Sequence, residues 1–179
     1  MNIHGSSTPH SLYSVLWACA LLMLFCVSCA NSNAIPLANF TENSVAVFIQ
    51  LEHKQDDSYQ LSARFTPPDD FHLYSKDIPR TGVDGLGRPT LLELPAGAKM
   101  QTAGPLTESV PAEIPAFEPK ELLVYPAGPV TLILPVSLPE NQTGATQDVL
   151  RITYMACGKT GCKPPVVGKI ISVNLPAQK

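Results

Sequence analysis

Proline is the feature that most restricts how this chain can fold. Eighteen prolines are distributed over 179 residues, and they interrupt nearly every long window of the sequence. Proline lacks a backbone donor and its ring clashes with the preceding turn of a helix, so long helices are disfavoured. No segment carries the apolar spacing of three to four residues that marks an amphipathic helix. The sequence therefore predicts short extended elements separated by proline-rich turns.

Between the prolines, apolar and polar residues alternate with a period of two. In the stretch 59–65, for example, the apolar positions are Tyr59, Leu61, Ala63 and Phe65. Alternation of this kind indicates a strand with one buried face. Eight segments fit a strand, either by alternation or as short apolar runs: 45–51, 59–65, 71–75, 90–94, 122–125, 130–138, 149–156 and 166–175.

Seven or eight short strands with proline and glycine turns predict an all-β fold built as a two-sheet sandwich. The stretch 95–120 holds five prolines and no clear alternation. We expect it to form a long loop over the sheets. A formal net charge of −3 provides no basic surface, which argues against nucleic acid as a partner.

The N-terminus has a different composition from the rest of the chain. No charged side chain precedes Glu42, and residues 12–27 are almost continuously apolar. That length fits the apolar region of a secretory signal better than a membrane span, although an uncleaved anchor is the main alternative. We therefore predict a signal peptide at 1–30, a polar leader at 31–43 and the sandwich at 44–176. In a second interpretation the signal ends at residue 28, and Cys29 carries a lipid that holds the protein on a membrane.

Export leaves two of the five cysteines in the mature chain, Cys157 and Cys162. In an oxidising compartment such a pair is expected to form a disulfide. A bridge over so few residues constrains the unfolded chain little, by roughly 2 kcal/mol, and a domain of this size can build a core without it. A purely structural role is therefore an incomplete explanation.

Strand parity and local charge bear on whether this pair is reactive. In the segment 149–157 the even positions form the more apolar face, so Cys157 is expected to emerge on the more polar side. Lys159 and Lys163 flank the pair, and nearby positive charge stabilises the thiolate that attacks in disulfide exchange. The alternative for both lysines is a solvated turn. These local arguments alone leave a redox role and a structural role equally supported.

Three segments resemble, in the same order, the periplasmic N-terminal domain of the DsbD thiol:disulfide interchange family. The run Tyr154-Met155-Ala156-Cys157, followed by Cys162-Lys163-Pro164-Pro165, is similar to that family's cysteine motif. The stretch 70–76 is similar to its aromatic-rich strand of the GYYLYRK type, and 130–136 to the strand before the motif. The similarity extends from about residue 45 to residue 175. The turn between the cysteines is one residue shorter than in the familiar enterobacterial form.

The resemblance implies an immunoglobulin-like sandwich in the periplasm and a redox-active pair. By position, Cys162 would form mixed disulfides with partners and Cys157 would resolve them. The implied partners are a membrane electron donor of the DsbD or CcdA type and periplasmic thioredoxin-like proteins. Because the given chain holds neither a membrane carrier nor a thioredoxin-like domain, electrons are expected to come from a separate protein. No cofactor or metal is expected.

The resemblance also suggests which side chains line the cysteine pair. Phe117, beside Glu118 in the proline-rich stretch, is the nearest counterpart of the family's shielding loop. Phe71 and Tyr74 are candidates for the lining, with ordinary core aromatics as the alternative interpretation.

Two other functions stay open at this point. The first is a non-catalytic binding module that keeps the sandwich and a structural disulfide. The second is binding of a soft metal ion by two thiolates, which lacks a third ligand near the pair because His72 is remote in sequence.

Overall fold

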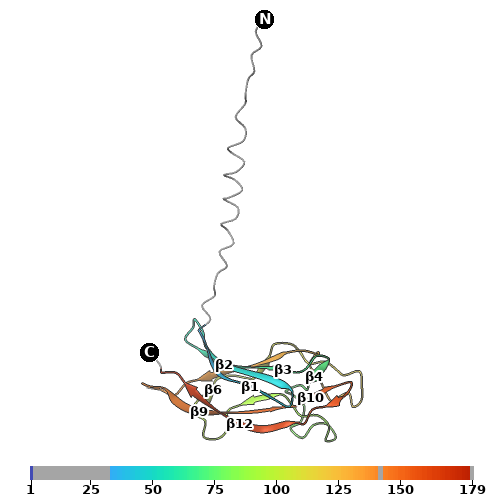
Figure 1. Ribbon diagram of the computed structural model, residues 1–179. Helices are drawn as coiled ribbons and strands as arrows, with labels where there is room; N and C mark the ends of the chain where they lie inside the picture. The colour runs from blue at the N-terminus through green and yellow to red at the C-terminus, as the bar shows by residue number, and fades with distance from the viewer. Residues whose placement is uncertain (2–32, 141–142, 178–179) are drawn as a thin grey trace. The chain divides into compact units, whose positions relative to one another are not determined.

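A computed structural model describes Met1 and residues 33–140 and 143–177. The predicted signal peptide, the Cys29 lipidation and the first residues of the leader lie outside the described residues. Every regular element of the described chain is a β-strand, arranged as an immunoglobulin-like sandwich (Figure 1). The described residues include no helix whose length and apolar character would let it cross a membrane.

The larger sheet is antiparallel and contains six strands. Its central strands are β2 (Val45–His53), β3 (Tyr59–Thr66) and β8 (Val130–Ser137), with β1 (Ala34–Glu42) on the outer side of β2. Two short strands, β6 (Gln101–Thr102) and β7 (Thr107–Glu108), both pair with β8. The predicted alternation is confirmed here, since in β2 and β3 every second residue is buried.

Two three-stranded sheets complete the fold. The first has the order β12 (Val166–Leu175), β9 (Thr146–Tyr154) and β5 (Leu91–Glu93). The second has the order β11 (Gly161–Cys162), β10 (Ala156–Gly158) and β4 (Phe71–Leu73). Figure 1 shows β4 and β10 together at one end of the sandwich, and this end carries both cysteines.

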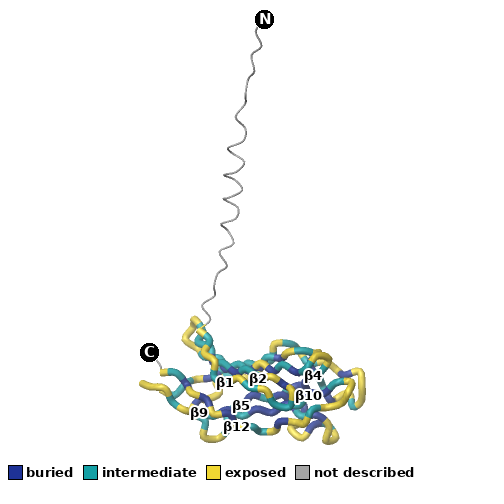
Figure 2. The backbone as a smooth tube through the Cα atoms, in the orientation of Figure 1, coloured by how far each residue is buried: buried dark blue, intermediate teal, exposed yellow. Residues whose placement is uncertain are grey.

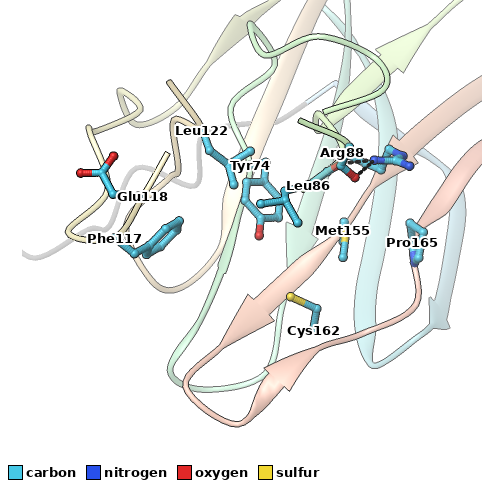
Figure 3. Close-up of a pocket in the computed structure, with 11 residues that line it drawn as sticks. Tyr74, Leu86, Arg88, Phe117, Glu118, Leu122, Met155, Cys162 and Pro165 are labelled. Atoms are coloured by element: carbon cyan, nitrogen blue, oxygen red, sulfur yellow. Dashed lines mark hydrogen bonds between the residues drawn. The ribbon is translucent and has the colours of Figure 1, made fainter. Parts of the chain in front are cut away.

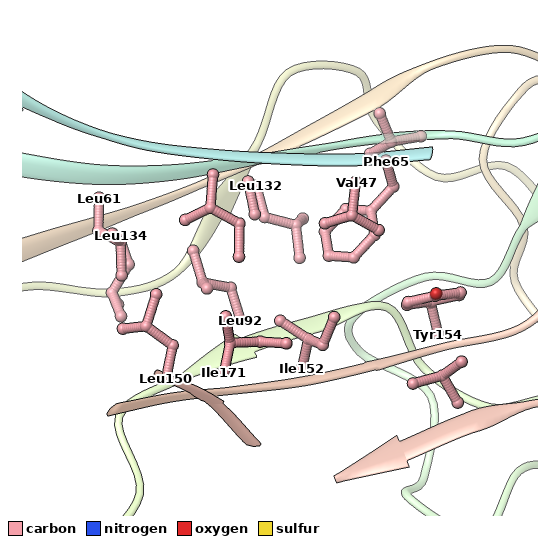
Figure 4. Close-up of a cluster of buried hydrophobic side chains, with 14 of the residues drawn as sticks. Val47, Leu61, Phe65, Leu92, Leu132, Leu134, Leu150, Ile152, Tyr154 and Ile171 are labelled. Atoms are coloured by element: carbon pink, nitrogen blue, oxygen red, sulfur yellow. The ribbon is translucent and has the colours of Figure 1, made fainter. Parts of the chain in front are cut away.

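The core lies between the six-stranded sheet and the sheet of β12, β9 and β5. Leu61, Phe65 and Leu132 face it from one side, and Leu150 and Ile152 from the other (Figure 4). All five side chains are fully buried. Figure 2 shows that buried positions follow the strands, whereas exposed positions concentrate in the connecting loops. Burial of this apolar surface is the main source of stability.

The sandwich begins earlier than the sequence predicted. Residues 31–43, expected to be a polar leader, contain strand β1, which pairs with β2 along nearly its whole length. This strand lacks strict alternation because it is an edge strand of half-buried residues and its register shifts between Pro36 and Ala38. Proline is tolerated at such edges and bulges, where its missing N–H does not break the ladder.

The stretch 95–120 is mainly loop, as predicted, apart from the two-residue strands β6 and β7. The segment 122–125, expected to be a strand, makes only isolated bridges, from Val124 to Glu113 and to Tyr74. It still matters for the end of the sandwich, because the Tyr125 N–H donates to the Leu73 carbonyl at 2.8 Å and the Ser75 N–H donates to the Leu123 carbonyl at 2.9 Å. The continuation of β4 is thereby tied to this segment.

Candidate functional site: a disulfide with one exposed sulfur

The two cysteines lie directly opposite each other on a tight hairpin. Strands β10 and β11 pair Cys157 with Cys162 and Gly158 with Gly161, which leaves a two-residue loop between them. The disulfide joins Cα atoms 4.0 Å apart. Gly161 has a φ of 119°, a backbone conformation that favours glycine. The predicted disulfide is therefore present, and the hairpin register produces it.

Burial differs sharply between the two ends of this disulfide. Cys157 is 4% exposed, whereas Cys162 is an exposed residue. An incoming thiolate must reach the sulfur that it attacks, so Cys162 is the accessible end and Cys157 the shielded one.

The expectation that Cys157 would emerge on the polar side is wrong. As the strand alternation requires, the Cys157 side chain is not part of the main core. It is nevertheless buried, in a second cluster with Tyr74, Ile78 and Leu122. Strand β9 ends at Tyr154, and beyond Met155 the chain pairs with β4 instead. Segments that follow β4 and precede β8 cover the face that the alternation alone would leave to solvent.

Strand β4 contributes a histidine next to the disulfide. In the pairing of β10 with β4, His72 lies opposite Cys157, and Phe71 lies opposite Gly158. Because side chains directly opposite each other share a face, His72 lies on the face that carries both sulfurs. Cys157 thus has a cysteine on one neighbouring strand and a histidine on the other.

Two aromatic rings enclose the imidazole of His72. Phe117 stacks on it, with ring centroids 5.7 Å apart, and Tyr74 meets it edge-on at 5.4 Å. The Nε2 atom of His72 is buried and has no hydrogen-bond partner among the described residues. Burial lowers the pKa of His72 and raises the pKa of Tyr74, because in each case it disfavours the charged form. Both side chains are therefore neutral near pH 7.

A cavity of about 270 Å³ opens beside the exposed cysteine. Cys162 lines it together with Tyr74, Leu86, Phe117 and Met155 (Figure 3). In this view the Cys162 side chain points toward the space between Phe117 and Met155. Leu86 is 53% exposed and Phe117 41% exposed, so apolar side chains of the cavity reach solvent, and Arg88 and Glu118 also line it.

The other predicted lining residues lie elsewhere. Phe71 is on the opposite face of β4, where it packs against the main core and approaches Gly158. The Lys163 ammonium lies 5.3 Å from the centroid of the Phe71 ring. Lys159 occupies the exposed loop between β10 and β11. Of the five candidates, Tyr74 and Phe117 are the two that meet Cys162 at the cavity.

Sequence reasoning missed the most informative neighbour of the pair. The distance of His72 along the sequence argued against it only as a third metal ligand, but strand pairing brings it opposite Cys157. Predicting this contact requires the register between β4 and β10, which no local pattern contains. Within the described ranges no group of three or more His, Cys, Asp or Glu side chains is arranged to hold a metal ion.

No family model and no curated protein matches this chain. The resemblance to the DsbD N-terminal domain therefore depends on the motifs quoted above and stays a prediction.

Proposed function

We propose that this protein is a periplasmic thiol:disulfide interchange carrier that moves two electrons through the pair Cys157 and Cys162. In this proposal the chain is exported by its N-terminal signal. It is reduced by a separate membrane donor of the DsbD or CcdA type and reduces periplasmic thioredoxin-like proteins. The single observation that carries the proposal is the unequal burial of the two cysteines, with Cys162 exposed at a cavity and Cys157 buried behind it.

The unequal burial supports a defined order of steps. A thiolate of the donor attacks Sγ of Cys162, the disulfide breaks, and its electron pair leaves on Cys157. A second donor thiolate then displaces Cys162, so that the donor is oxidised by two electrons and the pair is reduced. In the next half-reaction the Cys162 thiolate attacks a disulfide of the acceptor. Cys157 then attacks Sγ of Cys162 and releases the reduced acceptor.

The alternative is a binding module in which the disulfide is only structural. The two functions predict different reduction potentials. Exchange-active disulfides lie above about −300 mV, whereas inert structural bridges typically lie below that value.

Equilibration of the folded protein with glutathione buffers measures the reduction potential. We expect a value above about −300 mV and complete loss of electron transfer in Cys162→Ala. A potential far below that limit, or transfer that persists in Cys162→Ala, would reject the proposal in favour of the structural bridge.

A further inference from the structure

The half-buried imidazole of His72, opposite Cys157, has no role in the steps described so far. His72 lies opposite Cys157 across the β4–β10 pair, on the side away from Cys162. Side chains directly opposite each other in an antiparallel pair have Cβ atoms about 4.5–5.5 Å apart, which allows their polar ends to meet. Its Nε2 atom is nevertheless buried and unpartnered while the disulfide is closed.

An unpartnered buried nitrogen is a cost that proteins rarely retain without a use. In the closed disulfide the Cys157 sulfur is neutral and only a weak acceptor. When the bond opens, that sulfur gains the electron pair and becomes a thiolate, which is a strong acceptor. Opening the disulfide therefore creates the partner that Nε2 lacks.

We propose that His72 is a positioning residue for the redox pair, whose Nε2–H donates a hydrogen bond to the Cys157 thiolate once the disulfide is broken. This inference rests on the proposed exchange function and assigns a task within it. As a donor's thiolate attacks Cys162, the electron pair of the broken bond passes to Cys157 Sγ, and no proton transfer from the imidazole is required. A stabilised thiolate is a better leaving group, so this contact favours reduction of the pair.

The surrounding rings suit this task. Phe117 stacks on one face of the imidazole and Tyr74 contacts it edge-on, so its orientation is restricted. Burial keeps His72 neutral near pH 7, which leaves it able to donate from one nitrogen without adding a charge.

Other charged groups near the pair are engaged elsewhere. Arg88 donates to the carbonyls of Thr81, Gly85 and Gly87, and the Lys163 ammonium lies over Phe71. The Glu118 carboxylate pairs with the Lys120 ammonium at 3.5 Å. Tyr74 stays neutral because burial raises its pKa. His72 is thus the titratable side chain paired directly with Cys157 on the β4 side.

The first test compares reduction potentials of the full chain in wild type, His72→Phe and His72→Gln. His72→Phe removes one hydrogen bond to a charged group. We therefore expect the pair to become about tenfold harder to reduce, which is a shift of its reduction potential by about 30 mV to a more negative value. His72→Gln retains an N–H donor and should recover part of that shift. The matched control is His53→Phe, which alters a histidine stacked on Tyr59 and should leave the potential unchanged.

The second test measures the ionisation of Cys157 by thiolate absorbance in a Cys162→Ser background. Adding His72→Phe should weaken the acidity of Cys157 by about tenfold, and His72→Gln should weaken it less. Potentials and acidities that do not respond to either change at residue 72 would overturn the inference.

A third measurement requires no substitution, in case His72→Phe does not fold. The ¹⁵N resonance of His72 Nε2 in wild type should shift when the disulfide is reduced, and an unchanged resonance would reject the contact. These outcomes are separate from those that test the exchange function. A wild-type potential far below −300 mV that still responds to His72 would reject exchange while supporting the contact.

Discussion

At the scale of single residues, the two cysteines differ in solvent accessibility because different side chains surround them. Cys157 and Cys162 are identical in covalent chemistry and share one hairpin, yet one is packed against Tyr74, Ile78 and Leu122 while the other faces solvent. Shielding restricts attack to Cys162. In the proposed exchange it would also keep Cys157 in place for the intramolecular step, where proximity to Cys162 replaces a second encounter.

Gly158 is the residue that allows β4 to approach the hairpin closely. A Cβ atom built there would lie 2.9 Å from the Phe71 ring and 3.1 Å from the Asp70 carbonyl oxygen. We predict that Gly158→Ala lowers the free energy of unfolding by about 1–3 kcal/mol, since either the ring or the backbone must shift. Chemical denaturation of the oxidised protein measures the change.

Gly144→Ala is the matched control for that substitution. A Cβ atom at Gly144 would meet nothing within 4 Å, and this glycine has no positive φ. Its stability should therefore be close to that of wild type. Equal stability of the two variants would show that the approach of Phe71 to the hairpin is not required.

At the scale of elements, the segment that carries Phe117 covers the face next to the cysteines. It is anchored by backbone hydrogen bonds between Glu113 and Val124, at 2.7 and 3.0 Å, and Phe117 stacks on His72. The ring of Phe117 is 41% exposed, so only part of its surface is held by packing. The segment is therefore fixed by the backbone hydrogen bonds of Glu113, whereas the Phe117 side chain is only partly packed.

Removing that ring should open the route to the disulfide. We predict that Phe117→Ala increases the rate at which a small dithiol reduces the pair several-fold, with little change in stability. Ile114→Ala, which removes a 71% exposed side chain of the same segment, is the control and should leave the rate unchanged. A rate that is equal in Phe117→Ala and wild type would mean that Phe117 does not limit access.

Strands β5 and β9 are linked by a carboxylate shared between two arginines. Glu93 accepts hydrogen bonds from Arg80 and, at 3.2 Å, from the Nε atom of Arg151. The bond from Arg80 is the largest cause of a lowered Glu93 pKa, with Arg151 contributing, while burial acts in the opposite direction. A carboxyl with a lowered pKa adds stability above its unfolded pKa, and that stability is lost as the pH falls through the folded pKa.

We therefore predict that Glu93→Gln reduces the free energy of unfolding by about 1 kcal/mol at neutral pH. The difference from wild type should disappear as the pH falls below the folded pKa of Glu93. Thermal unfolding as a function of pH measures this, with Glu121→Gln, which alters an exposed carboxylate, as the control. A difference that is constant with pH would exclude the ionised carboxylate as its cause.

How well the sequence predicts each strand depends on its neighbours. Strands β2, β3, β8 and β12 match the predicted segments within about two residues, because a fully buried face imposes a clear alternation. Strand β1 was missed because an edge strand buries little. The division of 149–156 into β9 and β10 was also missed, since it depends on pairing with β4. The cysteine pair was predictable from the sequence, whereas the contacts of His72 and the cavity lining depend on register.

At the scale of the whole molecule, the sandwich and the disulfide hairpin pack in different clusters that meet at strands β4 and β10. The main core is formed by the six-stranded sheet and the sheet of β12, β9 and β5, with Leu73 of β4 and Ala156 of β10 also part of it, while Cys157 belongs to the smaller cluster at one end. The side chain of Cys157 therefore lies outside the main core, although its neighbour Ala156 is part of it.

Trapping of partner proteins in the native host tests the central claim most directly. Cys157→Ser leaves Cys162 able to attack but removes the thiol that would release the partner, so mixed disulfides through Cys162 should accumulate and be identifiable by mass spectrometry. Cys162→Ser is the matched control, and its remaining thiol, on Cys157, is buried. We predict trapped thioredoxin-like or membrane partners with Cys157→Ser and none with Cys162→Ser. Absence of mixed disulfides in Cys157→Ser, or equal trapping by both variants, would contradict the account.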